Sequence, residues 1–161
     1  MTAPASRRAG LAMLVGAPAA ALLLSVVPAF EGVRHDPYLD IVGVRTVCFG
    51  HTGADIAARR YGDGECRALL EADLAHHAAP VLGCTPQLRG KPYLTAAAVS
   101  FAYNVGTRAY CGSGVARDFR RGQDRSACAG LSQWVYAGGR RVAGLVTRRA
   151  AERALCERGL R

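Results

Sequence analysis

The chain contains almost no lysine, although it is strongly basic. Lys91 is the only lysine among the 21 basic residues, so arginine carries almost all of the formal net charge of +9. A positive surface suits an anionic partner such as nucleic acid, acidic phospholipid or a cell-wall polymer. A GC-rich genome, which encodes arginine freely, explains the bias equally well. The basic runs Arg120-Arg121 and Arg140-Arg141 lack interleaved aromatic residues, so we expect no nucleic-acid partner.

The six cysteines lack the close spacing of a metal site. No two of them stand at the spacing of a zinc knuckle, and no nearby histidine completes a ligand set. We therefore expect no metal and no cofactor. Their even number predicts disulfides and an oxidising compartment, and about fifteen full pairings are open. Proximity along the chain favours one of these pairings, which joins Cys48 with Cys66, Cys84 with Cys111, and Cys128 with Cys156.

Charge is also missing from a long N-terminal run, Ala9 to Phe30, which follows Arg7 and Arg8. Residues 11–30 amount to about twenty residues, just enough to cross a bilayer as a helix. The two preceding arginines predict that the chain emerges on the outer side, in the periplasm of a Gram-negative cell. The run is a weak anchor because about half of it is Ala, Gly, Ser or Pro. Such a segment could also leave the membrane.

The remaining residues predict an α+β fold that is mostly helical. A β-rich stretch covers 38–50, with a turn at Gly43. Apolar residues at helical spacing and suitable cap residues follow. The expected helices are 63–82, 95–105, 113–121, 124–136 and 147–158.

Two carboxylates follow the uncharged run at a defined spacing. Eight residues separate Glu31 from Asp40, and five separate Asp40 from Thr46. Glycoside hydrolysis uses one carboxyl to protonate the leaving oxygen and another to handle the water or the oxocarbenium charge. Thr46 is expected to hold a water together with Asp40. Surface carboxylates are common, so this spacing alone is weak evidence.

The residues around these carboxylates resemble the motif of phage-type lysozymes, glycoside hydrolase family 24. The similar strings are Glu31-Gly32, Pro37-Tyr38-Leu39-Asp40, Gly43, Thr46, Gly50-His51-Thr52-Gly53, 100–106, 134–139, 144–149 and Glu152. The resemblance covers roughly 31–156. It implies a lysozyme-like fold with a small β-element after the N-terminal helix. It also implies hydrolysis of the β-1,4 bond between N-acetylmuramic acid and N-acetylglucosamine in peptidoglycan glycan strands, with Glu31, Asp40 and Thr46 as catalytic residues.

Several other side chains have expected places. Tyr103 and Asn104 are expected to line the glycan cleft, although Tyr103 suits the core equally well. His51 is expected to be a structural partner of a nearby carboxylate, and Trp134 to be a core residue. The basic pair Arg148-Arg149, like the pair at 140 and 141, is expected on a solvated face by default.

The weak membrane segment next to Glu31 is similar to the N-terminal segment of the signal-arrest-release endolysins of lambdoid phages. The string at 40–44 also resembles the corresponding string of these endolysins. This resemblance implies export by the host secretion machinery and an inactive form tethered to the inner membrane. Release into the periplasm then completes the helix that bears Glu31. Cleavage of a signal peptide at Val27-Pro28-Ala29 is the alternative, but it leaves Glu31 second from the new N-terminus. We therefore expect an uncleaved segment, residues 1–30, a catalytic domain, residues 31–161, and a monomer.

Two other functions remain as alternatives. A lytic transglycosylase needs a glutamate but no water held by an aspartate, so Asp40 and Thr46 argue against it. A basic, membrane-tethered protein that binds the cell wall without cleaving it is the non-enzymatic alternative. The sequence leaves open whether cleavage inverts or retains the anomeric centre, because that depends on the separation of the two carboxyl groups.

Overall fold

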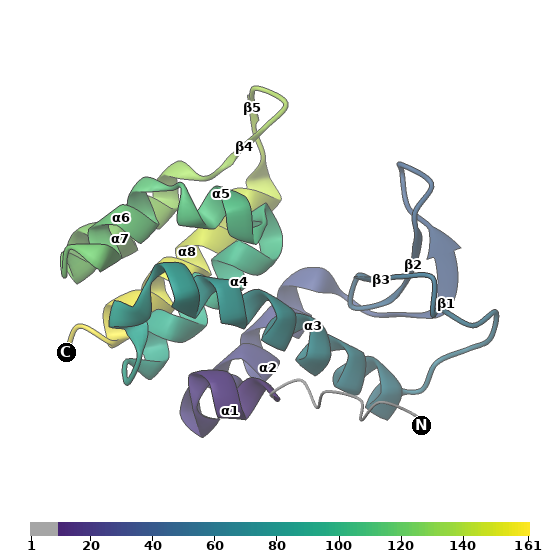
Figure 1. The fold of residues 1–161 in the computed structure, drawn as a ribbon. Helices are drawn as coiled ribbons and strands as arrows, with labels where there is room; N and C mark the ends of the chain where they lie inside the picture. Colours follow the sequence, from purple (N-terminus) through teal and green to yellow (C-terminus); the bar gives the residue numbers. More distant parts are fainter. Residues whose placement is uncertain (1–9) are drawn as a thin grey trace.

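The computed structural model describes residues 10–161, so Arg7 and Arg8 lie outside the described residues. The fold is α+β and mostly helical, as predicted (Figure 1). The helices are α1 (Leu11–Val15), α2 (Ala17–Glu31), α3 (Asp63–Cys84), α4 (Pro92–Val105), α5 (Thr107–Cys111), α6 (Gly114–Arg120), α7 (Asp124–Gly130) and α8 (Ala143–Arg158). The strands are β1 (Arg34–Leu39), β2 (Arg45–Cys48), β3 (His51–Thr52), β4 (Tyr136–Ala137) and β5 (Arg140–Arg141).

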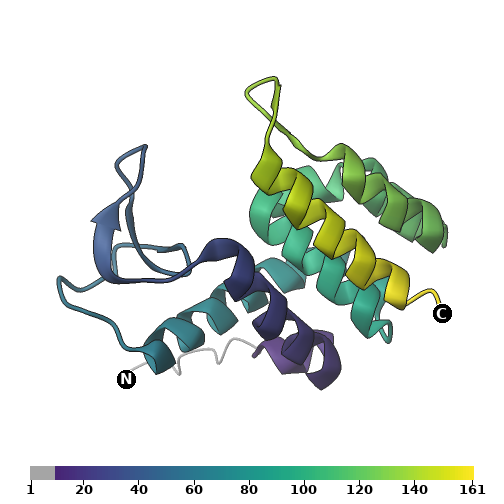
Figure 2. The ribbon, with the colours of Figure 1, turned by 180° about the vertical axis from the view of Figure 1, so that it is seen from behind.

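Helix α4 is the centre of the molecule. All of its residues from 94 to 102 are buried, and it packs against α2, α3 and α8. Figures 1 and 2 show α5 to α8 gathered on one side of it, while α3 carries the three-stranded sheet on the other side. Because α4 touches both parts, it fixes the position of α2, which ends at Glu31, relative to the C-terminal helix α8.

The uncharged N-terminal run forms two helices rather than one. Gly16 lies between α1 and α2 with φ +86°, a backbone conformation that favours glycine. Ala19, Leu23 and Val27 recur every four residues and are buried on one face of α2. Among residues 10–161, none of the helices has both the length and the apolar character that crossing a bilayer requires.

The expected helix over 124–136 is wrong in its second half. α7 ends at Gly130, a 3₁₀ turn follows at Leu131–Gln133, and the chain then enters the β4–β5 hairpin. Gly138 and Gly139 both have positive φ, which a tight two-residue hairpin turn requires. α8 also begins earlier than predicted, at Ala143, and α4 begins at Pro92, a residue well suited to the first turn of a helix.

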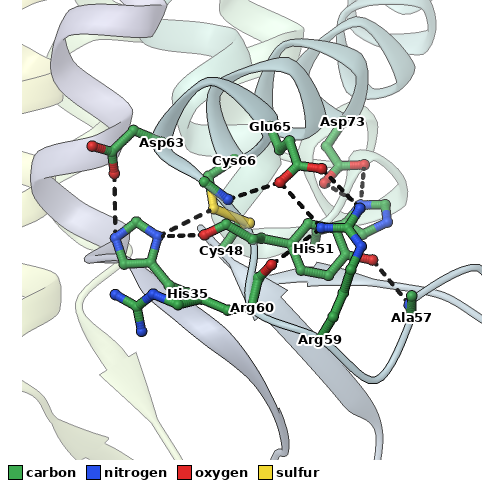
Figure 3. Close-up of a disulfide and its surroundings, with 12 residues drawn as sticks. His35, Cys48, His51, Ala57, Arg59, Arg60, Asp63, Glu65, Cys66 and Asp73 are labelled. Atoms are coloured by element: carbon green, nitrogen blue, oxygen red, sulfur yellow. Dashed lines mark hydrogen bonds and ion pairs between the residues drawn. A yellow bond between two sulfur atoms is a disulfide. The ribbon is translucent and has the colours of Figure 1, made fainter.

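The predicted disulfides are all confirmed: Cys48–Cys66, Cys84–Cys111 and Cys128–Cys156. Each joins two elements that are close in sequence, with separations of 18, 27 and 28 residues. Figure 3 shows the first of them, which fastens β2 to the first turn of α3. Closing a loop of this size limits the freedom of the unfolded chain and so stabilises the fold.

A second link between the sheet and α3 is the pair of His51 and Asp73, also drawn in Figure 3. The Nδ1 atom of His51 lies 2.9 Å from Asp73 Oδ2, and its Nε2 atom lies 3.4 Å from Asp55 Oδ1. This confirms the expected carboxylate partner of His51. Burial acts to lower the pKa of His51, but the hydrogen bonds and charges of Asp73 and Asp55 outweigh it, so the net pKa is raised.

The raised pKa predicts pH-dependent stability. The contribution of protonated His51 is complete below its unfolded pKa of about 6.5 and is lost as the pH rises through its higher folded pKa. We expect Asp73→Asn to reduce the free energy of unfolding by about 2 kcal/mol at pH 5 and by clearly less at pH 9. Denaturant unfolding at both pH values measures this. Asp63→Asn is the control, since Asp63 is almost fully exposed beside His35. Equal losses for Asp73→Asn at the two pH values would contradict the assignment.

Candidate active site

A groove of about 710 Å³ lies between the sheet and the helices α3 and α4. It is lined by the end of α2, the segment around β3, the middle of α3 and the end of α4. The lining residues are Glu31, Phe49, Gly50, His51, Thr52, Asp55, Leu69, Ala72, Asp73, His76, His77, Tyr103 and Asn104. The structure thus brings together three of the five predicted site residues, namely Glu31, Tyr103 and Asn104.

Glu31 is the last residue of α2, and its position follows from the packing of that helix. Gly32, with φ +65°, ends the helix and turns the chain towards β1. The side chain of Glu31 is 23% exposed, and its Oε1 atom accepts a hydrogen bond from Nη1 of Arg148. Within residues 10–161, Oε2 of Glu31 accepts no hydrogen bond. One carboxyl oxygen is therefore held by the protein, while the other is free to meet a substrate.

Arg148 belongs to a buried network of charges that sequence analysis missed. Its Nε atom lies 3.0 Å from Glu152 Oε1, and its Nη2 atom donates to the carbonyl oxygen of Ser100 at 3.0 Å. The hydroxyl of Ser100 also donates to Glu152, at 2.8 Å. The expectation of a solvated face is wrong for Arg148, because Glu152 and the Ser100 carbonyl oxygen hold its guanidinium inside the protein, where it also binds Glu31.

Arg149 is completely buried, so the same expectation is wrong for it as well. Its guanidinium donates to Glu152, to the amide oxygen of Asn104, and to the carbonyl oxygen of Trp134 at 3.0 Å. Burial lowers the pKa of Arg149, and the charge and hydrogen bond of Glu152 oppose that effect. The sequence feature that could have indicated this charge network is a pair of adjacent arginines followed by a glutamate one helical turn later.

Tyr103 and Asn104 shape the floor of the groove from α4. The hydroxyl of Tyr103 donates to the carbonyl oxygen of Phe49 at 3.1 Å, and its ring lies 5.0 Å from that of His77. Burial, with the nearby charges of Asp73 and Glu31, raises the pKa of Tyr103, so the hydroxyl stays protonated as a donor. Asn104 is exposed, and Arg149 fixes the orientation of its amide.

Asp40 and Thr46 do not line the groove. Asp40 is in the turn between β1 and β2, where its Oδ1 atom accepts from the backbone N–H groups of Val42 and Val44 at 2.9 and 2.8 Å. Thr46 is 4% exposed, and its hydroxyl donates to the carbonyl oxygen of Val44. It pairs across the sheet with Thr52, which does line the groove. The three candidates for catalysis are therefore not in mutual contact.

Trp134 packs against Phe101 with an edge-to-face geometry and a centroid distance of 5.2 Å. It is not part of the groove lining, which agrees with the expected core position. His77 turns inward, with its Nδ1 atom 2.7 Å from the carbonyl oxygen of Asp73, whereas its neighbour His76 is exposed. His76 and His77 therefore differ in their surroundings, although both line the groove.

Comparisons with known proteins agree on one family. A family model described as phage lysozyme matches residues 28–152. The SAR-endolysin of bacteriophage PS119 is 42% identical over 95% of this chain and 95% of its own. The active form of the P1 phage endolysin Lyz has a TM-score of 0.76 at 23% identity, covering 92% of this chain and 87% of that chain. The muramidase domain of SpmX from Asticaccaulis excentricus has a TM-score of 0.69 at 27% identity, covering 83% of this chain and 92% of that chain. The chain belongs to the phage lysozyme family.

Proposed function

We propose that this phage endolysin hydrolyses the β-1,4 bond between N-acetylmuramic acid and N-acetylglucosamine in peptidoglycan, and that Glu31 is its general acid. The observation that carries this proposal is the position of Glu31 in the groove, with Oε1 held by Arg148 and Oε2 open. A general acid needs both features, because one oxygen must be oriented and the other must deliver the proton to the leaving oxygen.

We propose Asp40 as the second carboxylate, with Thr46 of β2 helping it to hold a water. In lysozyme chemistry the second carboxylate stabilises the oxocarbenium charge or activates the water. Two backbone N–H groups bind Oδ1 of Asp40 and fix the orientation of its carboxylate, which leaves Oδ2 for the reaction. Asp40 stands at the tip of a hairpin outside the groove lining, so its role requires the glycan to extend beyond the groove, towards that hairpin.

Tyr103 and Asn104 are the proposed substrate-binding residues. Sugars bind to aromatic rings and amides, and these two side chains offer both beside Glu31. Their orientations are fixed by protein partners, the carbonyl oxygen of Phe49 for Tyr103 and Arg149 for Asn104. A side chain whose orientation is already fixed loses little entropy when the glycan binds.

We also propose that residues 1–30 tether the enzyme to the host inner membrane after export by the host secretion machinery, and that the enzyme becomes active in the periplasm after release. Relatives named SAR-endolysins and the continuity of α2 with Glu31 support this. Ala19, Leu23 and Val27 cannot contact lipid and pack against the protein core at the same time. While they lie in lipid, the helix that holds Glu31 opposite Arg148 is missing.

Glu31→Gln tests the catalytic proposal. We expect the rate of lysis of outer-membrane-permeabilised Gram-negative cells to fall by about 100- to 10,000-fold, because the proton donor is lost. Glu71→Gln, in a carboxylate on α3 outside the groove, is the control. Mass spectrometry of the muropeptides should find reducing ends with the unmodified protein. Anhydro ends would identify a lytic transglycosylase instead, and no cleavage by folded, membrane-free protein would leave the cell-wall-binding alternative.

The tethering proposal predicts two forms of different activity. We expect the membrane fraction of expressing Gram-negative cells to contain the intact chain with little muramidase activity per molecule. Collapse of the membrane potential should move the chain into the soluble periplasmic fraction and raise that activity. The intact mass of the released chain shows directly whether its N-terminal segment has been cleaved off. A membrane fraction with full activity, or a mature chain that begins after Ala29, contradicts the proposal.

Glu152→Gln tests the positioning of Arg148. Glu152 touches no substrate in the proposed mechanism, so we expect kcat to fall while KM changes little. The free energy of unfolding should also fall by about 3 kcal/mol, because two buried arginines lose a carboxylate. Glu157→Gln is a matched control on the same helix, since Glu157 forms an exposed pair with Arg153 that contributes about 0.5 kcal/mol or less. A rise in KM equal to the loss in kcat would contradict a positioning role.

A further inference from the structure

His77, in the second half of α3, is a groove residue to which the proposed mechanism assigns no role. It is partly buried and lines the groove together with Glu31, Tyr103 and Asn104. Its ring lies 5.0 Å from that of Tyr103, at an interplanar angle of 58°. The pKa of Tyr103 is raised by burial and by the charges of Asp73 and Glu31, so the proposed acid lies within electrostatic reach of that ring. His77 is therefore beside the part of the groove where the glycan is proposed to react.

A single hydrogen bond fixes which nitrogen of the His77 ring carries the proton. Its Nδ1 atom lies 2.7 Å from the carbonyl oxygen of Asp73, one helical turn earlier in α3. A carbonyl oxygen only accepts hydrogen bonds, so Nδ1 must be the donor. In the neutral imidazole the proton is then on Nδ1, and Nε2 is an acceptor without a hydrogen of its own.

The Nε2 atom of His77 is left for a group that enters the groove. Within residues 10–161, the side chain makes only the hydrogen bond from Nδ1. The nearby polar groups have other partners. The hydroxyl of Tyr103 donates to the carbonyl oxygen of Phe49 at 3.1 Å, so its hydrogen is not available to Nε2. The carboxylate of Asp73 binds Nδ1 of His51.

Asn104 adds a donor of fixed orientation to the same groove. Its amide oxygen accepts a hydrogen bond from Arg149, which can only donate, so the –NH2 group of the amide is on the other side. Within residues 10–161, that –NH2 group has no acceptor. Tyr103 precedes Asn104 in the chain and packs against His77. The groove therefore presents one free donor, one free acceptor and an aromatic ring close to both.

An acetamido group has the matching chemistry. Its carbonyl oxygen only accepts, its N–H only donates, and its methyl group is apolar. The hydroxyl groups of a glycan both donate and accept, so they do not distinguish between the two polar groups of the groove. On the basis of the glycosidase function proposed above, we propose that Nε2 of His77 accepts a hydrogen bond from the N–H of a 2-acetamido group of the glycan. His77 is then a specificity-determining residue, because a 2-substituent with no hydrogen to donate leaves Nε2 unpaired.

A tetramer of β-1,4-linked N-acetylglucosamine, labelled with ¹⁵N in its acetamido groups, is the probe for this contact. It is titrated at pH 8 into the folded, membrane-free Glu31→Gln chain, so that binding is measured without cleavage. We expect NMR to show a downfield shift of an acetamido proton and a change in the ¹⁵N signal of Nε2 of His77, because both atoms enter one hydrogen bond. A proton on Nε2 in the free protein, or no binding of the tetramer, would overturn the proposal.

His77→Phe in the same background keeps an aromatic ring against Tyr103 and removes the acceptor. We expect the affinity for the tetramer to fall about fivefold and the acetamido proton shift to disappear. His77→Gln carries an amide oxygen near the position of Nε2, so it should restore most of the affinity. Glu71→Gln, outside the groove on the same helix, is the matched control and should leave the affinity unchanged. A proton shift that persists in His77→Phe, or equal losses in His77→Phe and His77→Gln, would contradict the contact.

The glycan contact and the catalytic role of Glu31 fail separately in these measurements. Tetramer binding to the Glu31→Gln chain needs no catalysis, whereas muropeptide release does. Muropeptide release that persists in Glu31→Gln, beside weak tetramer binding in His77→Phe, would refute Glu31 as the acid and support the role of His77. Loss of release in Glu31→Gln, with full tetramer binding in His77→Phe, would refute the role of His77 alone.

Discussion

The ion pair of Glu31 with Arg148 joins two helices that are 117 residues apart in the sequence. Glu31 ends α2, Arg148 lies in α8, and α4 packs between and against both. The position of the proposed acid therefore depends on the packing of three helices rather than on its local sequence. Any change that displaces α2 moves the carboxylate away from its partner, even if the groove itself stays intact.

The charges around this pair are balanced within the protein. Glu31 and Glu152 face Arg148 and Arg149, and all of them except Glu31 are buried. Burying an arginine without a carboxylate is costly, so Glu152 is needed to keep two guanidinium groups inside. Arg148 also keeps Glu152 and the Ser100 carbonyl oxygen when Glu31 is absent. In the proposed tethered form, the guanidinium that receives Glu31 therefore still has two of its three partners.

Local patterns predicted the features that depend on nearby residues. The three disulfides join cysteines that are neighbours along the chain, and the turn at Gly43 follows from one glycine. The burial of Arg148 and Arg149 could not be predicted in this way, because their partners Ser100 and Asn104 come from α4, more than forty residues away. The pairing of charges over that distance depends on tertiary packing, which periodicity within one helix does not report.

The candidate site, like the fold, could be predicted only in part from the sequence. Motif resemblance named Glu31, Tyr103 and Asn104, and all three line one groove, because each lies near the end of a helix that borders it. It did not show that Asp40 lies in a projecting turn, where backbone donors bind its carboxylate. Spacing along the chain limits how far apart two residues can be, but the direction of a hairpin depends on its contacts. Here those contacts are the Cys48–Cys66 disulfide and the His51–Asp73 pair.

The composition of the N-terminal run has a second consequence in the folded molecule. Its many small residues gain little free energy from lipid, which makes a weak anchor. The same residues let α2 approach α4 closely, because Ala20 is buried in the core that also holds the run 96–98, three alanines of α4. Leu23 and Val27 then fill the remaining space nearer to Glu31. A more strongly hydrophobic segment with larger side chains would be held better by lipid and would be overpacked against α4. Both effects favour small residues in a segment that, as proposed above, leaves a bilayer and then packs into the protein core.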